Sequence, residues 1–210
     1  MDINQLIESG LVSSATTNNR VIPKLQSLSG VFNNQFNSVV EKVRNIKNDT
    51  SRVRSEKAPL YAKVSKKIDS ELAETLGIAF EVIQSEKALY QDTIDSTLKS
   101  GDKLVNLVLA MDLRDKKDSA KSLMESDIRY VQASNEFPAD YFKLNNSEMK
   151  ELQMSSLHKL MPELETKRQE IERSENHARH LTKYYDKLNG AVNGFTDAQA
   201  LENRVDPDTL

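Results

Sequence analysis

The chain has 210 residues, a net charge of −3, and neither cysteine nor tryptophan. This length suits one ordinary domain with a continuous core and leaves little room for two. Without cysteine there are no disulfides, thiolate metal sites or cysteine nucleophiles, so packing alone must hold the fold. The content of 29% charged and 6% aromatic residues is typical of long amphipathic helices that each bury one apolar stripe.

Residues 1–22 are rich in Ser, Thr and Asn and are predicted to form a flexible arm. Within the arm, Ile3, Leu6, Ile7 and Leu11 share one face of a short amphipathic helix that a partner or a membrane could order. The start of the chain lacks the features of a signal peptide, and no run of about 18 apolar residues occurs. We therefore expect a cytoplasmic protein, with peripheral membrane association as an option.

Apolar residues at steps of three and four predict a first long helix over residues 23–56. It begins at Pro23 and carries Phe32 and Phe36 on one seam. Pro59 is expected to interrupt the chain with a tight turn or a kink, because proline lacks an amide proton and disfavours helical geometry in the preceding residue.

Helical spacing continues over residues 59–134, which would make a helix about 110 Å long at about 1.5 Å per residue. Ser100-Gly101-Asp102 is the one expected break, where Gly101 would end one helix and Asp102 would cap the next. Because the apolar stripe crosses this point in phase, a kink is favoured over a reversal. The sequence therefore predicts one kinked second helix.

A loop is predicted over residues 137–146, before the last helix. Asn145, followed three residues later by Glu148, has the pattern of a capping box. The last helix is predicted over residues 147–189, with a bend at Pro162.

Gly190 and Gly194 are expected to end the last helix. Beyond it, residues 191–210 are predicted to form a disordered acidic tail. The predicted fold class is thus all-α, an elongated bundle of three long kinked helices with coiled-coil-like packing, in which residues 23–190 form the helical domain.

The sequence has no glycine-rich phosphate loop, nucleophile elbow or paired-carboxylate motif. His177 and His180 lie one turn apart on the last predicted helix, but no Glu-x-x-His pair accompanies them, so they are interpreted as part of a solvated charged face. His158 is interpreted as a half-buried packing residue. The carboxylates of residues 112–118 lack the spacing of a calcium loop. We therefore expect no enzyme activity, no cofactor and no metal.

Charge falls into two adjoining blocks of opposite sign. Residues 41–67 hold nine Lys/Arg against three acids, and residues 68–101 hold seven acids against two Lys. Either the basic block binds an anionic surface such as acidic lipid, or it pairs with the acidic block within one chain or across an antiparallel dimer. Nucleic acid is disfavoured, because aromatic residues are not interleaved with the cations. The candidate binding residues are Lys42, Arg44, Lys47, Arg52, Arg54, Lys57, Lys63, Lys66 and Lys67.

Three long helices, a flexible arm and breaks at Pro59, Gly101 and Pro162 form a layout that resembles the BAR domain family over about residues 25–190. The resemblance implies an antiparallel, crescent-shaped dimer. Its membrane-facing surface would carry the cations of residues 42–67. The net charge of −3 and the acidic block depart from the usual basic pattern of that family.

Homodimerisation is also expected because three slender helices with few aromatic residues would leave apolar side chains incompletely covered within one chain. Examples are Phe32, Phe36, Leu76 and Phe80. The predicted function is that of a non-enzymatic, BAR-like helical dimer that binds an anionic membrane surface or acts as a scaffold for protein partners. The alternative is a coiled-coil adaptor or assembly subunit of a larger complex, with no lipid contact.

Overall fold

A computed structural model of the chain describes residues 21–99, 101–116 and 119–202. In that part of the chain every regular element is a helix, which confirms the predicted all-α class. The contacts divide the chain into two units, Met1–Gln84 with Glu172–Leu210 and Ser85–Ile171, whereas we expected one helical domain. We call these the first and the second unit.

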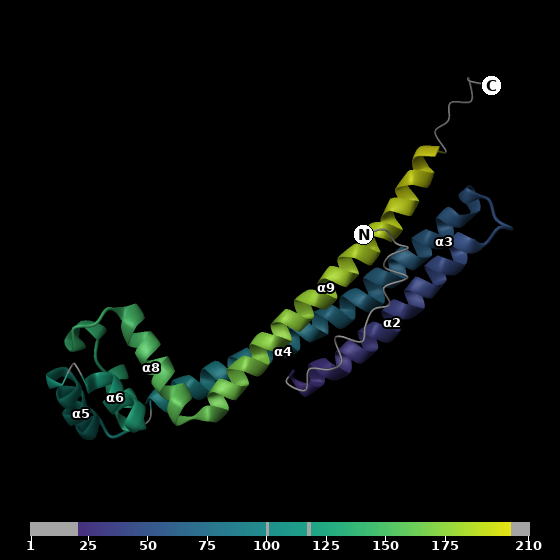
Figure 1. The fold of residues 1–210 in the computed structure, drawn as a ribbon. Coiled ribbons are helices and arrows are strands. Elements are labelled where there is room, and N and C mark those ends of the chain that lie inside the picture. Colours follow the sequence, from purple (N-terminus) through teal and green to yellow (C-terminus); the bar gives the residue numbers. More distant parts are fainter. Residues whose placement is uncertain (1–20, 100, 117–118, 203–210) are drawn as a thin grey trace. The chain divides into compact units, whose positions relative to one another are not determined.

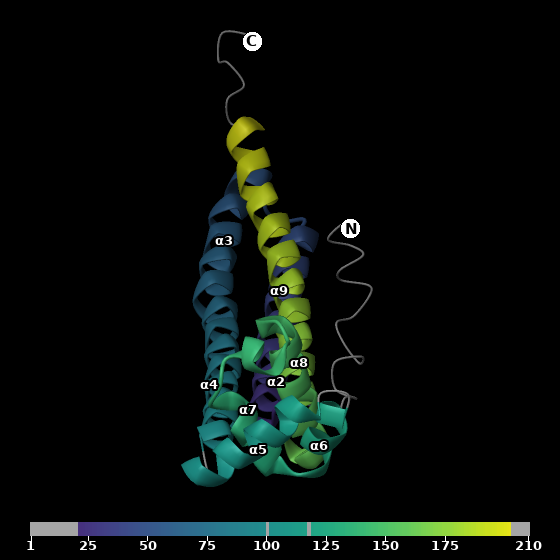
Figure 2. The same ribbon diagram turned by 90° about the vertical axis from the view of Figure 1, so that its left-hand side faces the viewer.

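The first unit is built from three helical segments that run alongside one another (Figures 1 and 2). They are α2 (Pro23–Asn48), then α3 (Arg54–Lys67) continuing through the π-helical turn η1 (Ile68–Leu72) into α4 (Ala73–Lys99), and finally α9 (Pro162–Glu202). The boundary between the units falls within α4 and within α9. The shared core consists of Phe32, Phe36, Val39, Val43, Tyr61, Val64, Ile68, Leu72, Leu76, Leu181, Leu188 and Val192.

The π-helical turn keeps the middle segment facing this core. Its buried residues Val64, Ile68, Leu72 and Leu76 follow one another at steps of four. In an α-helix each such step would rotate the buried stripe by about 40°. The wider turn of η1 absorbs this rotation, so the stripe stays buried.

The first helix ends at Asn48, and the predicted end at residue 56 is wrong. The chain turns just after it, where the Asp49 carboxylate accepts a hydrogen bond from the Ser51 amide at 2.9 Å. Asp favours such turns because its side chain can bond the backbone two residues on. The tight turn considered at Pro59 is wrong as well, since the chain has already turned after Asn48 and Pro59 lies inside α3.

The second unit is made of shorter helices. They are α5 (Lys103–Asp115), α6 (Ala120–Ser126), α7 (Ile128–Asn135), the 3-10 turn η3 (Ala139–Phe142) and α8 (Asn146–Leu160). With parts of α4 and α9 they enclose a separate core of Ile94, Ala110, Leu113, Met124, Val131, Ala133, Ala139, Phe142, Met149, Leu157 and Leu164.

The predicted single helix over residues 59–134 is therefore wrong in its second half. The break at Gly101 is confirmed: Gly101 has a φ of 136°, and the Asp102 carboxylate caps α5 by accepting two backbone amides at 2.8 and 3.3 Å. Two further breaks separate α5, α6 and α7. At the second of them Asp127 caps α7 by accepting a backbone amide at 2.9 Å. These breaks were missed because helical apolar spacing continues across them.

The start of α8 agrees with the prediction. Asn145 accepts two backbone amides at 2.9 Å each, and the Glu148 carboxylate accepts the Asn145 amide at 2.9 Å, which completes the capping box. The prediction of one bent helix over residues 147–189 is wrong, because the chain breaks where a bend was expected: α8 ends at Leu160 and α9 begins at Pro162.

The predicted end of the last helix is wrong, since α9 runs past Gly190 and Gly194. Val192 is fully buried in the first core. Phe195 stacks on Tyr61, with the ring centroids 5.1 Å apart. These contacts compensate for the low helix propensity of glycine.

The predicted arm lies mostly outside the described residues. Its last member, Ile22, is buried, and its amide donates to the Ser174 hydroxyl at 3.1 Å, so it belongs to the first unit. Residues 203–210 of the predicted tail also lie outside the described residues.

Candidate functional site

The predicted basic block occupies α2, α3 and the connection between them. The side chains of Lys57 and Lys67 are half-buried, and that of Arg54 lies outside the described part of the structure. The exposed members of the block are Lys42, Arg44, Lys47, Arg52, Lys63 and Lys66.

The fold brings cations from two helices together. Lys42 on α2 lies beside Lys67 on α3, and interaction with the Lys67 ammonium lowers the pKa of Lys42. Along the same pair of helices, the Lys57 ammonium donates to the Lys47 carbonyl at 3.1 Å. We call these four lysines the basic seam. Their proximity depends on the packing of α2 against α3 and could not be predicted from spacing along the sequence.

The basic and acidic blocks also pair with each other, as the sequence allowed. The Lys67 ammonium lies 3.2 Å from the Glu71 carboxylate, one turn along the helix. The acidic block has a partner on α9 too, where Lys167 lies 2.6 Å from Glu86. The acidic block is therefore paired with cations on both α3 and α9.

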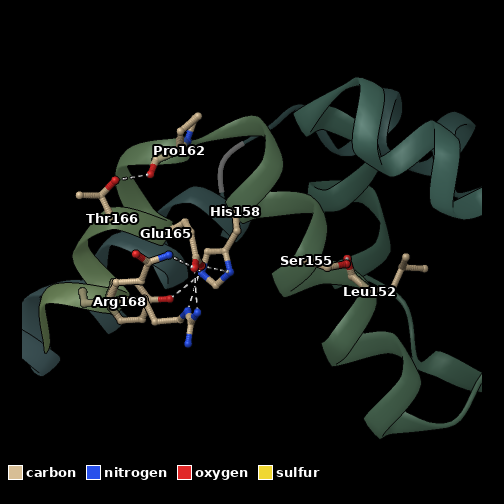
Figure 3. A network of polar contacts seen from close by, with 9 residues as sticks. Leu152, Ser155, His158, Pro162, Glu165, Thr166 and Arg168 are labelled. Atoms are coloured by element: carbon tan, nitrogen blue, oxygen red, sulfur yellow. Dashed lines mark hydrogen bonds and ion pairs between the residues drawn. The ribbon is translucent and has the colours of Figure 1, made fainter. Parts of the chain in front are cut away.

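A polar network joins α4, α8 and α9 within the second unit (Figure 3). The Tyr90 hydroxyl lies 2.8 Å from Nε2 of His158, and Nδ1 of His158 lies 3.2 Å from the Glu165 carboxylate. That carboxylate also accepts hydrogen bonds from Arg168 at 2.7 and 2.9 Å and from Gln169 at 2.7 Å. We call these five residues the His158 network.

The protonation states in the His158 network fit its geometry. Burial lowers the pKa of His158, so the imidazole is neutral near pH 7. Its Nδ1–H then donates to Glu165, and its Nε2 accepts from Tyr90. Hydrogen bonds from Arg168 and Gln169 lower the pKa of Glu165 to about 2, so this carboxylate stays ionised. The network therefore connects α4, α8 and α9 through the contacts of His158 with Tyr90 and Glu165.

The interpretation of His158 as a half-buried packing residue is confirmed. Its polar partners were missed, and the spacing of Glu165 and Arg168 by three residues was the available signal. The interpretation of His177 as solvated is wrong. His177 is half-buried, and its Nε2 lies 2.6 Å from the Ser29 hydroxyl, whereas His180 is exposed as expected.

The second unit also contains an apolar cavity of about 190 Å³. Its described walls do not include Tyr90, His158 or Glu165, so this cavity would not bring a ligand to the His158 network. The residues that line it are Leu113, Ala120, Lys121, Met124, Phe142, Leu144, Met149 and Leu152.

Asp112 and Asp115, two of the carboxylates of residues 112–118, pair with neighbouring cations. Asp112 lies 2.9 Å from Lys116, and Asp115 lies 3.1 Å from Arg114. Asp118 lies outside the described residues. In the described ranges, no group of three His, Asp or Glu is placed to hold a metal ion.

Membrane contact by a spanning helix finds no support in this fold. Every helix in the described part of the chain is too short or too polar to cross a bilayer. Nor do known proteins supply a parallel. No protein-family model, curated protein or solved structure matches the chain.

Proposed function

We propose that the chain is a non-enzymatic interaction protein whose first unit binds an anionic membrane surface through the basic seam and the exposed cations around it. The observation that carries this proposal is that the packing of α2 against α3 gathers cations of both helices on one surface, where the Lys57 ammonium lies 3.1 Å from the Lys47 carbonyl. Like charges at short distance repel, and an anion between them relieves the repulsion. The phosphate and carboxylate groups of acidic lipids supply such anions.

The number of exposed cations makes this binding strong enough to measure. Six members of the basic block are exposed among the eight whose side chains the structure describes. Each cation near an acidic membrane contributes about 1 kcal/mol, so four or five would contribute about 4 to 5 kcal/mol per chain. This attraction weakens with salt, because exposed charges are screened beyond about 10 Å at 0.1 M.

For the first unit we also propose a BAR-like antiparallel homodimer. The long helices and the basic seam of this unit support that proposal. One reason given for dimerisation is wrong, because a single chain buries Phe32, Phe36 and Leu76. Phe80, which is 39% exposed, is the member of that set that a partner could still cover. Dimerisation would double the cations that one particle presents to a membrane.

The alternative is an adaptor or assembly subunit without lipid contact. It is favoured by pairing inside the chain, since Lys67 lies 3.2 Å from Glu71 and Arg52 lies 3.4 Å from Asp49. Cations held in this way contribute less to an outside surface.

Vesicle binding distinguishes the membrane-binding function from the adaptor function. At low salt the protein should co-sediment with vesicles that contain phosphatidylserine, and high salt should release the part of the binding that comes from charge. Lys63→Glu with Lys66→Glu should weaken the low-salt binding at least about tenfold. The control, Lys183→Glu with Lys187→Glu, changes two exposed lysines on α9 by the same charge.

Wild-type protein that ignores acidic vesicles at low salt would reject lipid binding by the basic block. If the Lys63 and Lys66 variant also melted earlier or lost its oligomer, the adaptor function would be supported.

A further inference from the structure

Helix α5 turns an apolar face to the solvent. The usual amphipathic helix buries its apolar side and exposes its polar side. In α5 the buried side includes Asn106, which is 1% exposed. Leu104 and Val108 are 75% and 66% exposed. The exposed apolar side chains, which we call the α5 face, are Leu104, Val105, Leu107, Val108 and Met111.

Polar anchors fix the rotation of α5. On the buried side, the Asn106 amide donates to the Glu136 carboxylate at 2.8 Å. On the flank, the Tyr130 hydroxyl donates to Asp112 at 2.9 Å. Turning the α5 face inward would break both bonds and would expose Leu113, which is now buried on the opposite side of the helix. The exposure of the apolar side chains is thus built into the fold.

The α5 face carries no net charge. Residues 104–111 include no charged side chain. The two carboxylates at its C-terminal end are each paired, Asp112 with Lys116 at 2.9 Å and Asp115 with Arg114 at 3.1 Å. Paired in this way, they repel an anionic surface less than free carboxylates would.

The size of the α5 face argues for lipid over a second copy of the chain. A helix of 13 residues is about 20 Å long and about 10 Å wide, so one face covers roughly 200 Å². A specific protein interface buries about 800 Å² on each partner and relies on aromatic or Arg anchors. The α5 face is much smaller and contains no aromatic or Arg side chain, whereas a bilayer interface needs no shape complementarity.

We propose that α5 lies in the interfacial layer of a lipid bilayer, with the α5 face inserted between acyl chains. An amphipathic helix in this position buries its apolar face by about 5 to 10 Å. The proposal rests on the proposed function in naming a membrane as the partner. Binding by insertion of α5 can be measured apart from binding by the basic seam, because apolar insertion requires no acidic lipid and is not screened by salt.

The absence of cysteine allows a site-specific probe. A polarity-sensitive fluorophore on Val108→Cys should shift to the blue with phosphatidylcholine vesicles at high salt and become shielded from an aqueous quencher. The matched control is the same probe on Val31→Cys, a valine 46% exposed in the first unit and outside the basic block, which should stay in water. In unlabelled protein, Leu104→Ser with Val108→Ser should weaken this binding at least about tenfold.

A probe at position 108 that stays in water while the protein is bound to vesicles would overturn the insertion, as would wild-type protein that does not bind phosphatidylcholine at high salt. If the Ser variant instead lost a dimer, the α5 face would belong to a second copy. Binding that persists at high salt but ignores acidic lipid would keep the insertion and reject the proposed role of the basic seam.

Discussion

The first and second units use the same residue spacing in opposite ways. In the first unit, apolar residues at steps of three and four, such as Phe32 and Phe36, lie in the core. In the second unit, Val105 and Val108 follow the same spacing and are 43% and 66% exposed, while Asn106 between them is buried. Apolar spacing therefore predicts that a segment is helical. It does not predict which side faces the core once polar anchors are present.

The prediction with the largest expected effect compares two leucines, one in each unit. Leu188→Ala empties a fully buried site in the first core and should lower the free energy of unfolding by about 2 to 5 kcal/mol. Leu104→Ala removes a side chain that is 75% exposed and should change it by less than about 0.5 kcal/mol. Urea denaturation measures both. Equal losses would mean that the α5 face is covered within the chain.

A second comparison uses glycine. Gly101→Ala should destabilise the second unit by about 1 to 3 kcal/mol, because the backbone has a φ of 136° and the added Cβ would lie 2.9 Å from the Asn106 side chain. Gly77→Ala should stabilise the first unit by about 0.5 to 1 kcal/mol, since it lies inside α4 with no atom near the added Cβ. Thermal melting should show shifts of opposite sign.

The smallest expected effect is a pH dependence. Because burial lowers the pKa of His158, the unfolded chain binds more protons than the folded chain below about pH 6.5. Stability is then fully present above about pH 6.5 and is lost as the pH falls toward the lowered pKa. Burial also lowers the pKa of His177, so this residue adds a similar pH dependence to the stability of the first unit.

His158→Gln separates the two histidines. Glutamine can accept from Tyr90 and donate to Glu165 but does not titrate. Denaturation at several pH values should show that the free energy of unfolding of this variant falls less steeply than that of the wild type between about pH 6.5 and 5. An unchanged slope would assign the whole effect to His177.

Local signals in the sequence predicted part of the fold. Asp102 and the capping box at Asn145 act within a few residues and were found, whereas at Pro162 only a bend was predicted where the helix in fact breaks. The helix continues past Gly190 because of contacts with a distant segment. A glycine costs a helix about 1 kcal/mol, and burial of Val192 outweighs this cost.

The candidate sites were likewise predictable only in part. The exposure of Lys63 and Lys66 follows from their charge and could be predicted. The approach of Lys42 to Lys67 and the contact of Tyr90 with His158 depend on how separate helices pack. No spacing along one helix contains that information.

The π-helical turn η1 has a consequence for how the chain could change in evolution. If one residue between Ile68 and Leu72 were deleted, the buried positions from Tyr61 to Ile83 would fall at alternating steps of three and four, as in a regular heptad repeat. Elsewhere in a helix, a single deletion rotates all following side chains by about 100°. Here it would leave an uninterrupted α-helix with its core intact, so this segment behaves as a one-codon insertion that a gene could gain or lose.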